Sequence, residues 1–354
     1  MRAAHCLKSR AASLFAAVVA AVLTLASCSV HEWPDEDTLA RLKLNFSFAT
    51  DLPPYLDIRY DTRAGISPDG YDVRYTVKFY PQLPGGDYAG NESIAYTTVL
   101  TKDDVTELNY SAVVPLPEGR WRIRCWVDYV THGSTADLFY DTGDFGAIRI
   151  PEEYAADNDF KDAFLGCADV DLYRVGSREE PVEATLEMER PLAKFQFIAT
   201  DLEKLVMKVL REKMALEDGT DRPSESAAAG FNPEDYYIRF YYTSFLPCVF
   251  NMFTDKPTDS RMGDQFESEF IPLSEDEVLM GFDYVLVNGT ESSVQVQVAL
   301  YDRETCELLS LTQSITVPLV RSKVTTVRGD FLTLGTGGGI GIDAEFDDEY
   351  NVFL

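Results

Sequence analysis

Alternation of apolar and polar residues with a period of two is the feature that most constrains the fold of this chain. It recurs over residues 42–48, 71–80, 120–130, 184–199 and 293–300. Successive side chains of a β-strand point to opposite faces, so each stretch predicts a strand with one buried face. In the third stretch the polar face carries Arg120, Arg122 and Arg124, for which we expect carboxylate partners on a neighbouring strand. The alternative is a cationic face that binds a ligand.

One strong helix is predicted among these strands. Apolar residues recur at helical spacing over 201–216, and Thr200 with Glu203 forms a capping-box pattern before them. Many short strands without βαβ alternation predict an all-β chain of antiparallel β-sandwiches rather than a doubly wound sheet. The strand-bearing part is longer than one sandwich of ~100 residues. We therefore expect two tandem sandwiches, over 39–190 and 191–335, with the helix in the second.

The N-terminus has the organisation of a lipoprotein signal. Cationic residues precede a charge-free apolar run over 11–25, which is shorter than the ~20 residues of a membrane-spanning helix. The Leu-Ala-Ser-Cys order that ends at Cys28 resembles a bacterial lipobox, which implies removal of residues 1–27 and acylation of Cys28. Several acyl chains would hold the protein stably on a membrane. A transmembrane anchor is the alternative.

Residues 28–38 are acidic and polar, with a proline and no apolar periodicity, and this pattern predicts a tether. Acidic residues after a lipidated cysteine resemble the export signal of surface lipoproteins in some Gram-negative anaerobes, and an ordinary spacer is the other interpretation. The whole chain of 354 residues has 31 Lys+Arg against 59 Asp+Glu, a net charge of −28. Such a surface repels phosphate, so we expect no nucleic acid as a partner.

Four cysteines remain after the predicted signal, and their wide spacing contains no Cys-x-x-Cys pair. A zinc site or a thioredoxin-like motif is therefore not supported. An exported protein permits disulfides, and four cysteines allow three pairings. Each cysteine lies in or beside an apolar, strand-like segment, so we expect four buried free thiols. These residues are Cys125, Cys167, Cys248 and Cys306.

Nothing in the sequence singles out a catalytic or metal site. Beyond the signal only His31 and His132 remain, and the usual nucleophile, zinc-protease and nucleotide-binding motifs do not occur. His132 lies two residues before Ser134, which is weak evidence for a nucleophile and base, and we expect an exposed turn residue. The acidic stretch 343–348 lacks the glycine of an EF-hand loop. We predict no enzyme, no cofactor and no metal.

The C-terminal tail is the sharpest local signal. Five glycines between 335 and 341 predict a flexible hinge, and apolar residues then occupy seven of the eight even positions from Ile340 to Leu354. This pattern predicts one long strand, tethered loosely and apolar along one side. Such a strand is suited to complete the sheet of another chain. The alternative is a last strand that pairs within its own domain.

Five segments resemble the fimbrillin-type (major and minor fimbrium, Mfa-like) lipoprotein pilus subunits of Gram-negative gut and oral anaerobes. They are residues 71–80, 116–130, 162–164, 189–195 and 317–330. The resemblance implies two transthyretin-like β-sandwich domains, secretion to the outer membrane and cell surface as a lipoprotein, and assembly with other fimbrial subunits by strand exchange. In that family an arginine-specific protease removes the lipidated first strand of shaft subunits, and anchor subunits stay lipidated.

Carried over to this chain, the removable strand is 42–48 and the cut follows Arg63 or Arg59, with Arg63 preferred. The donor strand is 340–354, after a glycine hinge that begins at 336, and its pocket-filling residues are Ile340, Ile342, Phe346, Tyr350 and Val352. Shaft, tip and anchor roles all stay open. The alternative function is a monomeric surface lipoprotein that binds glycans or a host protein.

Overall fold

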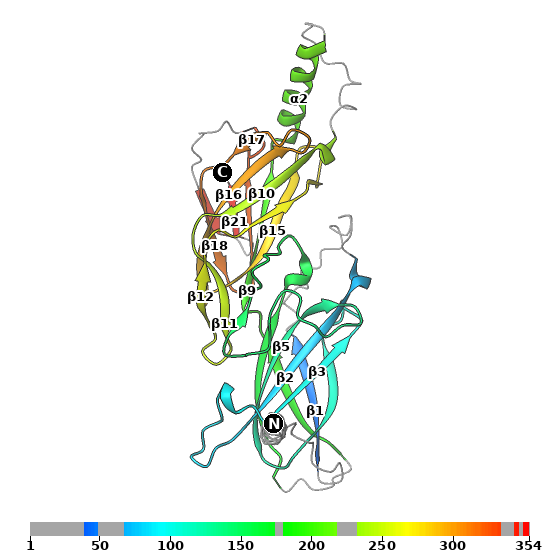
Figure 1. Cartoon of the computed structure of the whole chain (residues 1–354), viewed down its shortest axis with the longest axis vertical. Coiled ribbons are helices and arrows are strands. Elements are labelled where there is room, and N and C mark those ends of the chain that lie inside the picture. Colours follow the sequence, from blue (N-terminus) through cyan, green and yellow to red (C-terminus); the bar gives the residue numbers. More distant parts are fainter. Residues whose placement is uncertain are drawn as a thin grey trace, which may run out of the picture.

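The computed structural model describes residues 39–48, 67–173, 180–217, 232–333, 343–346 and 350–353. In these residues the fold is all-β, with one α-helix and four short 3-10 helices. Figure 1 shows the sheets in two groups that follow one another along the long axis, with β1, β2, β3 and β5 in one group and β9, β10, β15 and β16 in the other. The predicted all-β sandwich class is confirmed. The domain limits 39–190 and 191–335 stay predictions.

The first group contains two sheets. One has the order β4-β1-β8, and the other has the order β3-β2-β5-β7. The three-stranded sheet comprises β4 (Tyr110–Leu116), β1 (Ala40–Phe48) and β8 (Val182–Met188). The four-stranded sheet comprises β3 (Tyr96–Lys102), β2 (Tyr71–Pro81), β5 (Arg120–Thr131) and β7 (Phe164–Asp171). Their facing apolar side chains form a continuous core, as the period of two predicts.

Strand β2 departs from the predicted half-buried pattern, because both of its faces are buried from Asp72 to Tyr80. Its polar face lies under the loop that follows β5. Arg74 donates to Asp128 on β5 and to Asp137 in this loop, and the Lys78 ammonium donates to the loop carbonyls of Thr142 and Gly143. Sequence alternation identified the strand correctly but could not reveal that a distant loop covers its polar side.

The arginines of β5 have the partners that the sequence predicts. Arg122 makes two hydrogen bonds of 2.8 Å to Asp169 on β7, and Arg120 donates to Asp171 at 2.8 Å. The register of β5 against β7 places each of these pairs directly opposite. Arg124 instead donates to the carbonyl of Met252, so the three arginines hold neighbouring segments rather than form a free cationic face.

The second group also contains two main sheets, with the orders β13-β10-β16-β17 and β14-β15-β9-β19-β21-β20, and β18 also pairs with β16. The first comprises β13 (Gln265–Ser268), β10 (Tyr236–Tyr242), β16 (Glu291–Asp302), β17 (Leu308–Leu311) and β18 (Ile315–Val320). The second comprises β14 (Ile271–Pro272), β15 (Val278–Leu286), β9 (Leu192–Ala199), β19 (Val324–Gly329), β21 (Tyr350–Phe353) and β20 (Asp343–Phe346). Most ladders are antiparallel, but β1–β8, β9–β19 and β19–β21 are parallel.

Helix α2 (Leu202–Glu217) begins and ends within one residue of its predicted limits. Leu205 and Val209 belong to the second core, and Figure 1 shows α2 at one end of the molecule. The predicted capping box is wrong, because the helix begins at Leu202 and the residue before it is Asp201 rather than Thr200, whose hydroxyl donates to Asp330 Oδ1. The carboxylate of Asp201 binds the backbone N–H groups of Leu332 and Thr333, which ties the helix start to the segment after β19.

A small third sheet joins the two groups. It has the order β12-β11-β6 and comprises β12 (Lys256–Arg261), β11 (Leu246–Asn251) and β6 (Ile148–Arg149). Val249 and Phe250 on β11 pair with the two residues of β6, and Phe250 also packs near the ring of Trp126. The first hydrophobic core therefore extends into strands of the second group.

The four cysteines are all free, but only two are buried. Cys125 and Cys248 lie in the interior, whereas Cys167 and Cys306 are exposed. The prediction of four buried thiols is therefore wrong for two of them. Cys167 sits on the outward side of β7, and Cys306 lies in the turn before β17 with φ 58°. Among the described residues no helix is long and apolar enough to cross a membrane.

Candidate functional site

Strand β1 is the central strand of its sheet and comes first among the described elements. It pairs antiparallel with β4, from Ala40 opposite Leu116 to Phe46 opposite Tyr110. On its other edge it pairs in parallel with β8, from Leu42 opposite Val182 to Phe48 opposite Met188. Each edge has seven residue pairs, so every residue of β1 is paired on at least one edge and residues 42–46 are paired on both.

The inward side of β1 is a row of apolar side chains, each 8% exposed or less. The row comprises Ala40, Leu42, Leu44, Phe46 and Phe48. The Phe46 ring lies 4.8 Å from the ring of Tyr75 and 6.2 Å from that of Tyr110, and Phe48 packs edge-on against Phe164 at 5.0 Å. This row fills the space between the two sheets of the first group.

The outward side of β1 makes weaker, solvent-facing contacts. Lys43 forms an ion pair of 2.9 Å with Glu183 on β8, and their side chains are 36% and 58% exposed. The Asn45 amide donates to Glu183 Oε2 and its oxygen accepts from the Ser111 hydroxyl on β4. Exposed pairs of this kind contribute little, so the inward row and the backbone ladders hold the strand in place.

Removal of β1 would leave a groove with two unpaired strand edges and an apolar floor. The facing edges of β4 and β8 would both lose their hydrogen-bond partners, and unpaired buried backbone groups are unfavourable. The floor of the groove would be the apolar surface that the inward row now covers. A strand with apolar residues at every second position is the ligand that matches such a groove, because it supplies both hydrogen bonds and side chains.

Several predicted site residues fall outside the described residues. These are the lipidation candidate Cys28, the cleavage candidates Arg59 and Arg63, and the first two donor residues, Ile340 and Ile342. Strand β1 ends at Phe48, and the next described residue is Ser67. The cleavage candidates therefore lie in the connection between β1 and β2, and their roles stay predictions.

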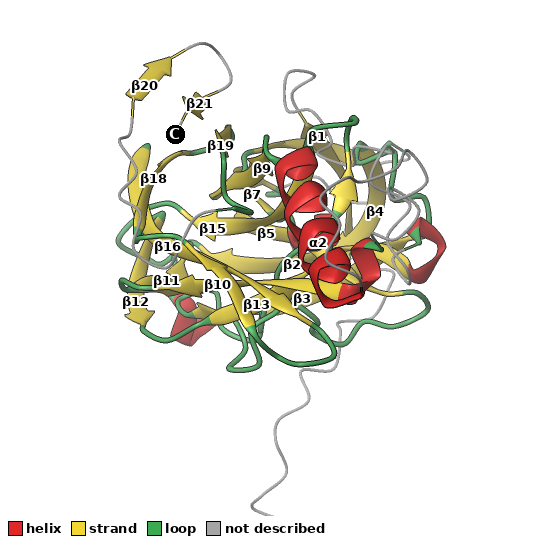
Figure 2. Ribbon diagram, turned by 90° about the horizontal axis from the view of Figure 1, so that it is seen from above, coloured by secondary structure: helices red, strands yellow, loops and turns green. Residues whose placement is uncertain are grey.

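The C-terminal tail differs from the single long strand that the sequence predicts. It forms two short strands, β20 and β21, that pair with each other antiparallel, with Phe346 opposite Tyr350 and Ala344 opposite Val352. Strand β21 also pairs in parallel with β19. Figure 2 places both strands at the periphery, beyond β19. In this structure the tail thus pairs with its own chain, and the donor role of Phe346, Tyr350 and Val352 stays a prediction.

His132 is 60% exposed, as expected of a turn residue, but it has a partner that the sequence does not indicate. Its Nδ1 lies 2.7 Å from Asp72 Oδ1, and this hydrogen bond raises the pKa of the imidazole. The Ser134 hydroxyl accepts from the N–H of Ala136 instead of meeting the histidine. The structure therefore does not assemble a serine and histidine pair here.

A cluster of buried charged side chains was missed by the sequence reasoning. Lys161 and Asp283 form an ion pair of 2.7 Å with side chains that are 1% and 0% exposed. Arg190 with Asp162, and Lys194 with Asp159, form ion pairs of the same length nearby. The sequence signal was available, because Asp283 is the one charged residue in the otherwise uncharged strand β15.

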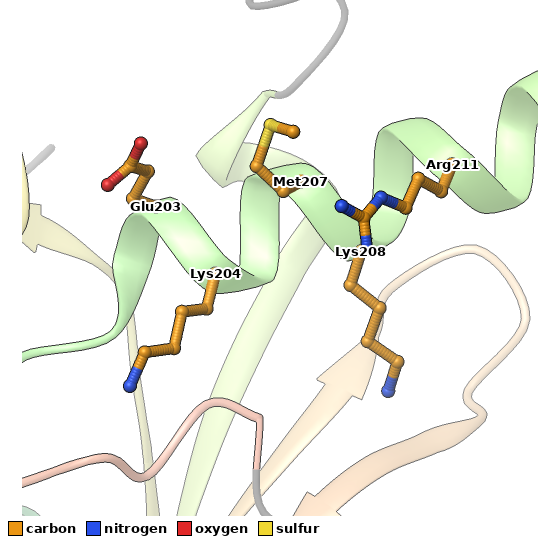
Figure 3. Close-up of a pocket in the computed structure, with 5 residues that line it drawn as sticks. All are labelled: Glu203, Lys204, Met207, Lys208 and Arg211. Carbon is orange, nitrogen blue, oxygen red and sulfur yellow. The ribbon is translucent and has the colours of Figure 1, made fainter. Parts of the chain in front are cut away.

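The side of α2 carries a second surface feature. Five side chains of this helix line a hollow of about 450 Å³, namely Glu203, Lys204, Met207, Lys208 and Arg211, and Figure 3 shows them along the helix. Lys204 is paired with Asp330, so part of the positive charge is already neutralised. Among the described residues no group of three or more His, Cys, Asp or Glu side chains is placed to hold a metal ion.

A model of a protein family of unknown function (DUF6562) matches residues 36–353. The chain belongs to this family. The matched range starts just before β1 and ends with β21, so the family comprises both groups of sheets and the C-terminal tail. No curated protein matches the chain.

Solved structures with a similar chain trace include three proteins of Bacteroidales. The fimbrial anchor protein Mfa2 from Porphyromonas gingivalis is 11% identical, with a TM-score of 0.36 over 77% of this chain and 82% of that one. Candidate cell adhesion proteins from Bacteroides ovatus and Bacteroides eggerthii are each 11% identical, with TM-scores of 0.40 and 0.38. They cover 82% and 87% of this chain, and 92% and 91% of their own length. A fimbrial protein is thus among these structures, as the sequence resemblance predicts, but such similarities say nothing about what this chain binds.

Proposed function

We propose that the chain is a non-enzymatic, lipidated subunit of a cell-surface fimbrium that assembles by β-strand exchange at the position of β1. The observation that carries the proposal is the placement of β1, a fully inserted central strand near the N-terminal end of the chain. It follows the lipobox and tether, and the candidate cleavage residues Arg59 and Arg63 come directly after it. One cut in that connection would separate β1 from the rest of the chain.

The driving force of exchange is the groove between β4 and β8. A donor strand restores the lost backbone hydrogen bonds and buries apolar side chains, and no covalent chemistry is needed. Residues 340–354 of another subunit have the required period of two. In the same direction as β1, a register that keeps Asp348 beyond the end of the buried row puts Ile340 in the place of Leu42 and Phe346 in the place of Phe48, against the ring of Phe164.

N-terminal sequencing of the surface-associated protein tests the maturation step. A start after Arg63 or Arg59 identifies a polymerised subunit whose first strand has left. A blocked, lipidated start at Cys28 identifies an anchor at the outer membrane, which accepts no donor in place of β1. In the first case, Arg63→Ala combined with Arg59→Ala is expected to abolish both the new N-terminus and fibre growth, whereas Arg41→Ala is the matched control.

Donor function is tested by a change that spares the fold of the subunit. Phe346→Asp places a charge on the apolar side of the tail, and Asp347→Asn changes the neighbouring polar position as the matched control. We expect electron microscopy to show no fibres for the first variant and normal fibres for the second. Normal fibres from Phe346→Asp, or an unfolded monomer after deletion of 340–354, would refute the donor role.

A second candidate function, glycan binding by the monomer, is favoured by one surface observation. Tyr237 and Tyr301 stack at 5.1 Å on the outer face of the sheet of β10 and β16, with Arg239 5.4 Å from the first ring and 5.5 Å from the second. Stacked aromatic faces beside charged groups suit sugar rings and their hydroxyls. Glycan arrays probed with wild-type monomer and Tyr301→Ala would test this function separately from fibre assembly.

A further inference from the structure

Lys161 and Asp283 come from segments 122 residues apart in the sequence and meet in the interior. Lys161 ends the short 3-10 helix η5 (Asp159–Lys161), and Asp283 lies in the middle of β15. Lys161 Nζ is 2.7 Å from Asp283 Oδ1, and the two side chains are 1% and 0% exposed. An amine and a carboxyl group are thus held together without access to bulk water.

The two oxygens of Asp283 have different surroundings. Oδ1 accepts from Lys161 Nζ and from the backbone N–H of Tyr284 at 2.7 Å. Oδ2 accepts from the phenol of Tyr242 at 2.5 Å and from the phenol of Tyr154. The Lys161 ammonium also lies 4.0 Å from the centre of the Tyr154 ring. One oxygen therefore faces the amine, while two hydroxyl donors hold the other.

Burial favours the uncharged form of the Lys161 amine. Removal from water lowers the pKa of the Lys161 amine, and the nearby carboxylate opposes this shift. Transfer of one proton from Nζ to Oδ1 gives a neutral amine beside a neutral carboxylic acid. A desolvated, neutral lysine amine is a nucleophile, and a hydrogen-bonding distance to Oδ1 places Nζ within roughly 3.5 Å of Cγ, the range of a near-attack geometry.

We propose that Lys161 and Asp283 condense to an intramolecular isopeptide bond. Nζ attacks Cγ, and the negative charge that develops on Oδ2 is stabilised by the hydroxyls of Tyr154 and Tyr242. The Cγ–Oδ1 bond then breaks, and Oδ1 leaves as water with two of the three ammonium protons. The third proton stays on the amide nitrogen. The reaction therefore balances without an oxidant, a reductant or a co-reactant.

The neighbouring pair of Lys194 and Asp159 provides an internal comparison. Lys194 Nζ is also 2.7 Å from its carboxylate, but the Tyr284 hydroxyl meets the same oxygen, Oδ1, at 3.1 Å. That phenol is not placed to stabilise charge on the opposite oxygen. The Asp159 side chain is also 13% exposed, which gives water access. The Lys161 pair thus combines full burial of both side chains with two phenol donors on the far oxygen.

The cross-link would have a mechanical consequence. It would join η5, which directly precedes β7 of the first group, to the central part of β15 in the second group, in parallel with the backbone connection between β8 and β9. Force applied along the molecule would then act on a covalent bond rather than on side-chain packing alone. This inference does not depend on strand exchange, since it concerns residues away from β1.

Peptide mapping of the purified full chain tests the proposal. A linked Lys161 resists trypsin, so residues 150–174 and 262–303 should appear as one joined species that lacks the mass of one water. Complete recovery of separate, unlinked peptides, in fresh and in long-incubated protein, would overturn the proposal and leave a buried ion pair. The readout does not require that any variant fold.

Variants locate the bond and its chemistry. Lys161→Arg retains the cation but should lose the joined species completely, whereas the matched control Lys194→Arg should keep it. Tyr242→Phe removes one donor to Oδ2 and should slow linkage about 100-fold, measured as the unlinked fraction over time after synthesis. A joined species of unchanged mass and yield in Lys161→Arg would refute the assignment of this lysine, and an unchanged rate in Tyr242→Phe would refute the role of the phenol.

Discussion

The inward row of β1 makes a quantitative prediction at Phe46. This side chain is 2% exposed and packs with the rings of Tyr75 and Tyr110 in a cluster of three aromatic rings. Replacement of a buried phenylalanine by alanine loses both the transfer free energy of the ring and the packing around the cavity left behind. We therefore expect Phe46→Ala to lower the free energy of unfolding by about 3–5 kcal/mol.

The matched control lies three residues earlier on the same strand, on its outward side. Lys43 points outward and pairs with the exposed Glu183, so Lys43→Ala should cost about 0.2–1 kcal/mol, and this cost should shrink as salt is added. Urea unfolding monitored by tryptophan fluorescence measures both variants, because Trp121 and Trp126 belong to the same core as Phe46. The slope of the unfolding free energy against urea should stay unchanged.

The difference in unfolding free energy between the two variants tests whether the apolar row holds β1 in place. Similar losses for Phe46→Ala and Lys43→Ala would mean that β1 is held by its backbone ladders and not by its apolar row. A loss below about 1 kcal/mol at Phe46 would lead to the same conclusion, since core phenylalanines lose several times that amount. In that case a donor strand would not need the apolar period of two, and the match between residues 340–354 and the groove would lose its physical basis.

Three further predictions concern other parts of the molecule. Gly281 has φ +154°, and a Cβ there would lie 2.7 Å from the Phe240 ring. The urea concentration at the midpoint of unfolding should therefore be lower for Gly281→Ala than for the wild type. Leu205→Ala in α2 should cost about 2–5 kcal/mol in the same measurement, because Leu205 is 1% exposed in the second core. Asp72 raises the pKa of His132, so this pair stabilises the fold at low pH and the contribution is lost as pH rises through the raised pKa. NMR titration should show a lower His132 pKa in Asp72→Asn, and an unchanged value would contradict the assigned contact.

Local sequence patterns were sufficient to predict a helix or strand where one side of the element faces the core and the other faces water. Strand β1 and its inward row follow from the alternation over 42–48, because each inward residue is apolar and each outward residue is polar. The limits of α2 follow in the same way from a helical period. For Arg120 and Arg122 the sequence predicts the type of partner, a carboxylate on a neighbouring strand, and β7 supplies one directly opposite each arginine of β5.

Contacts between distant segments were beyond the reach of such patterns. The polar face of β2 is buried because a loop some 60 residues later supplies Asp137 and two carbonyl oxygens. The exposure of Cys167 depends on which side of β7 faces the core, which neighbouring residues alone do not specify. The tail folds back as β20 and β21 in this structure, and the sequence pattern of one apolar side is equally compatible with a hairpin and with a long strand.

Several contacts join the two groups of sheets. They include the pairing of β6 with β11, the hydrogen bond from Arg124 to the Met252 carbonyl, and the ion pair of Lys161 with Asp283. Strand β1 instead pairs with β4 and β8, within the first group. The strand exchange that we propose for β1 would therefore leave these three contacts in place. Replacement of Phe46 by a charged residue should therefore disrupt the first core at a lower urea concentration than the second group. The fluorescence of Trp121 and Trp126 should change while the NMR signals of Tyr237 and Tyr301, on the second group, are still native.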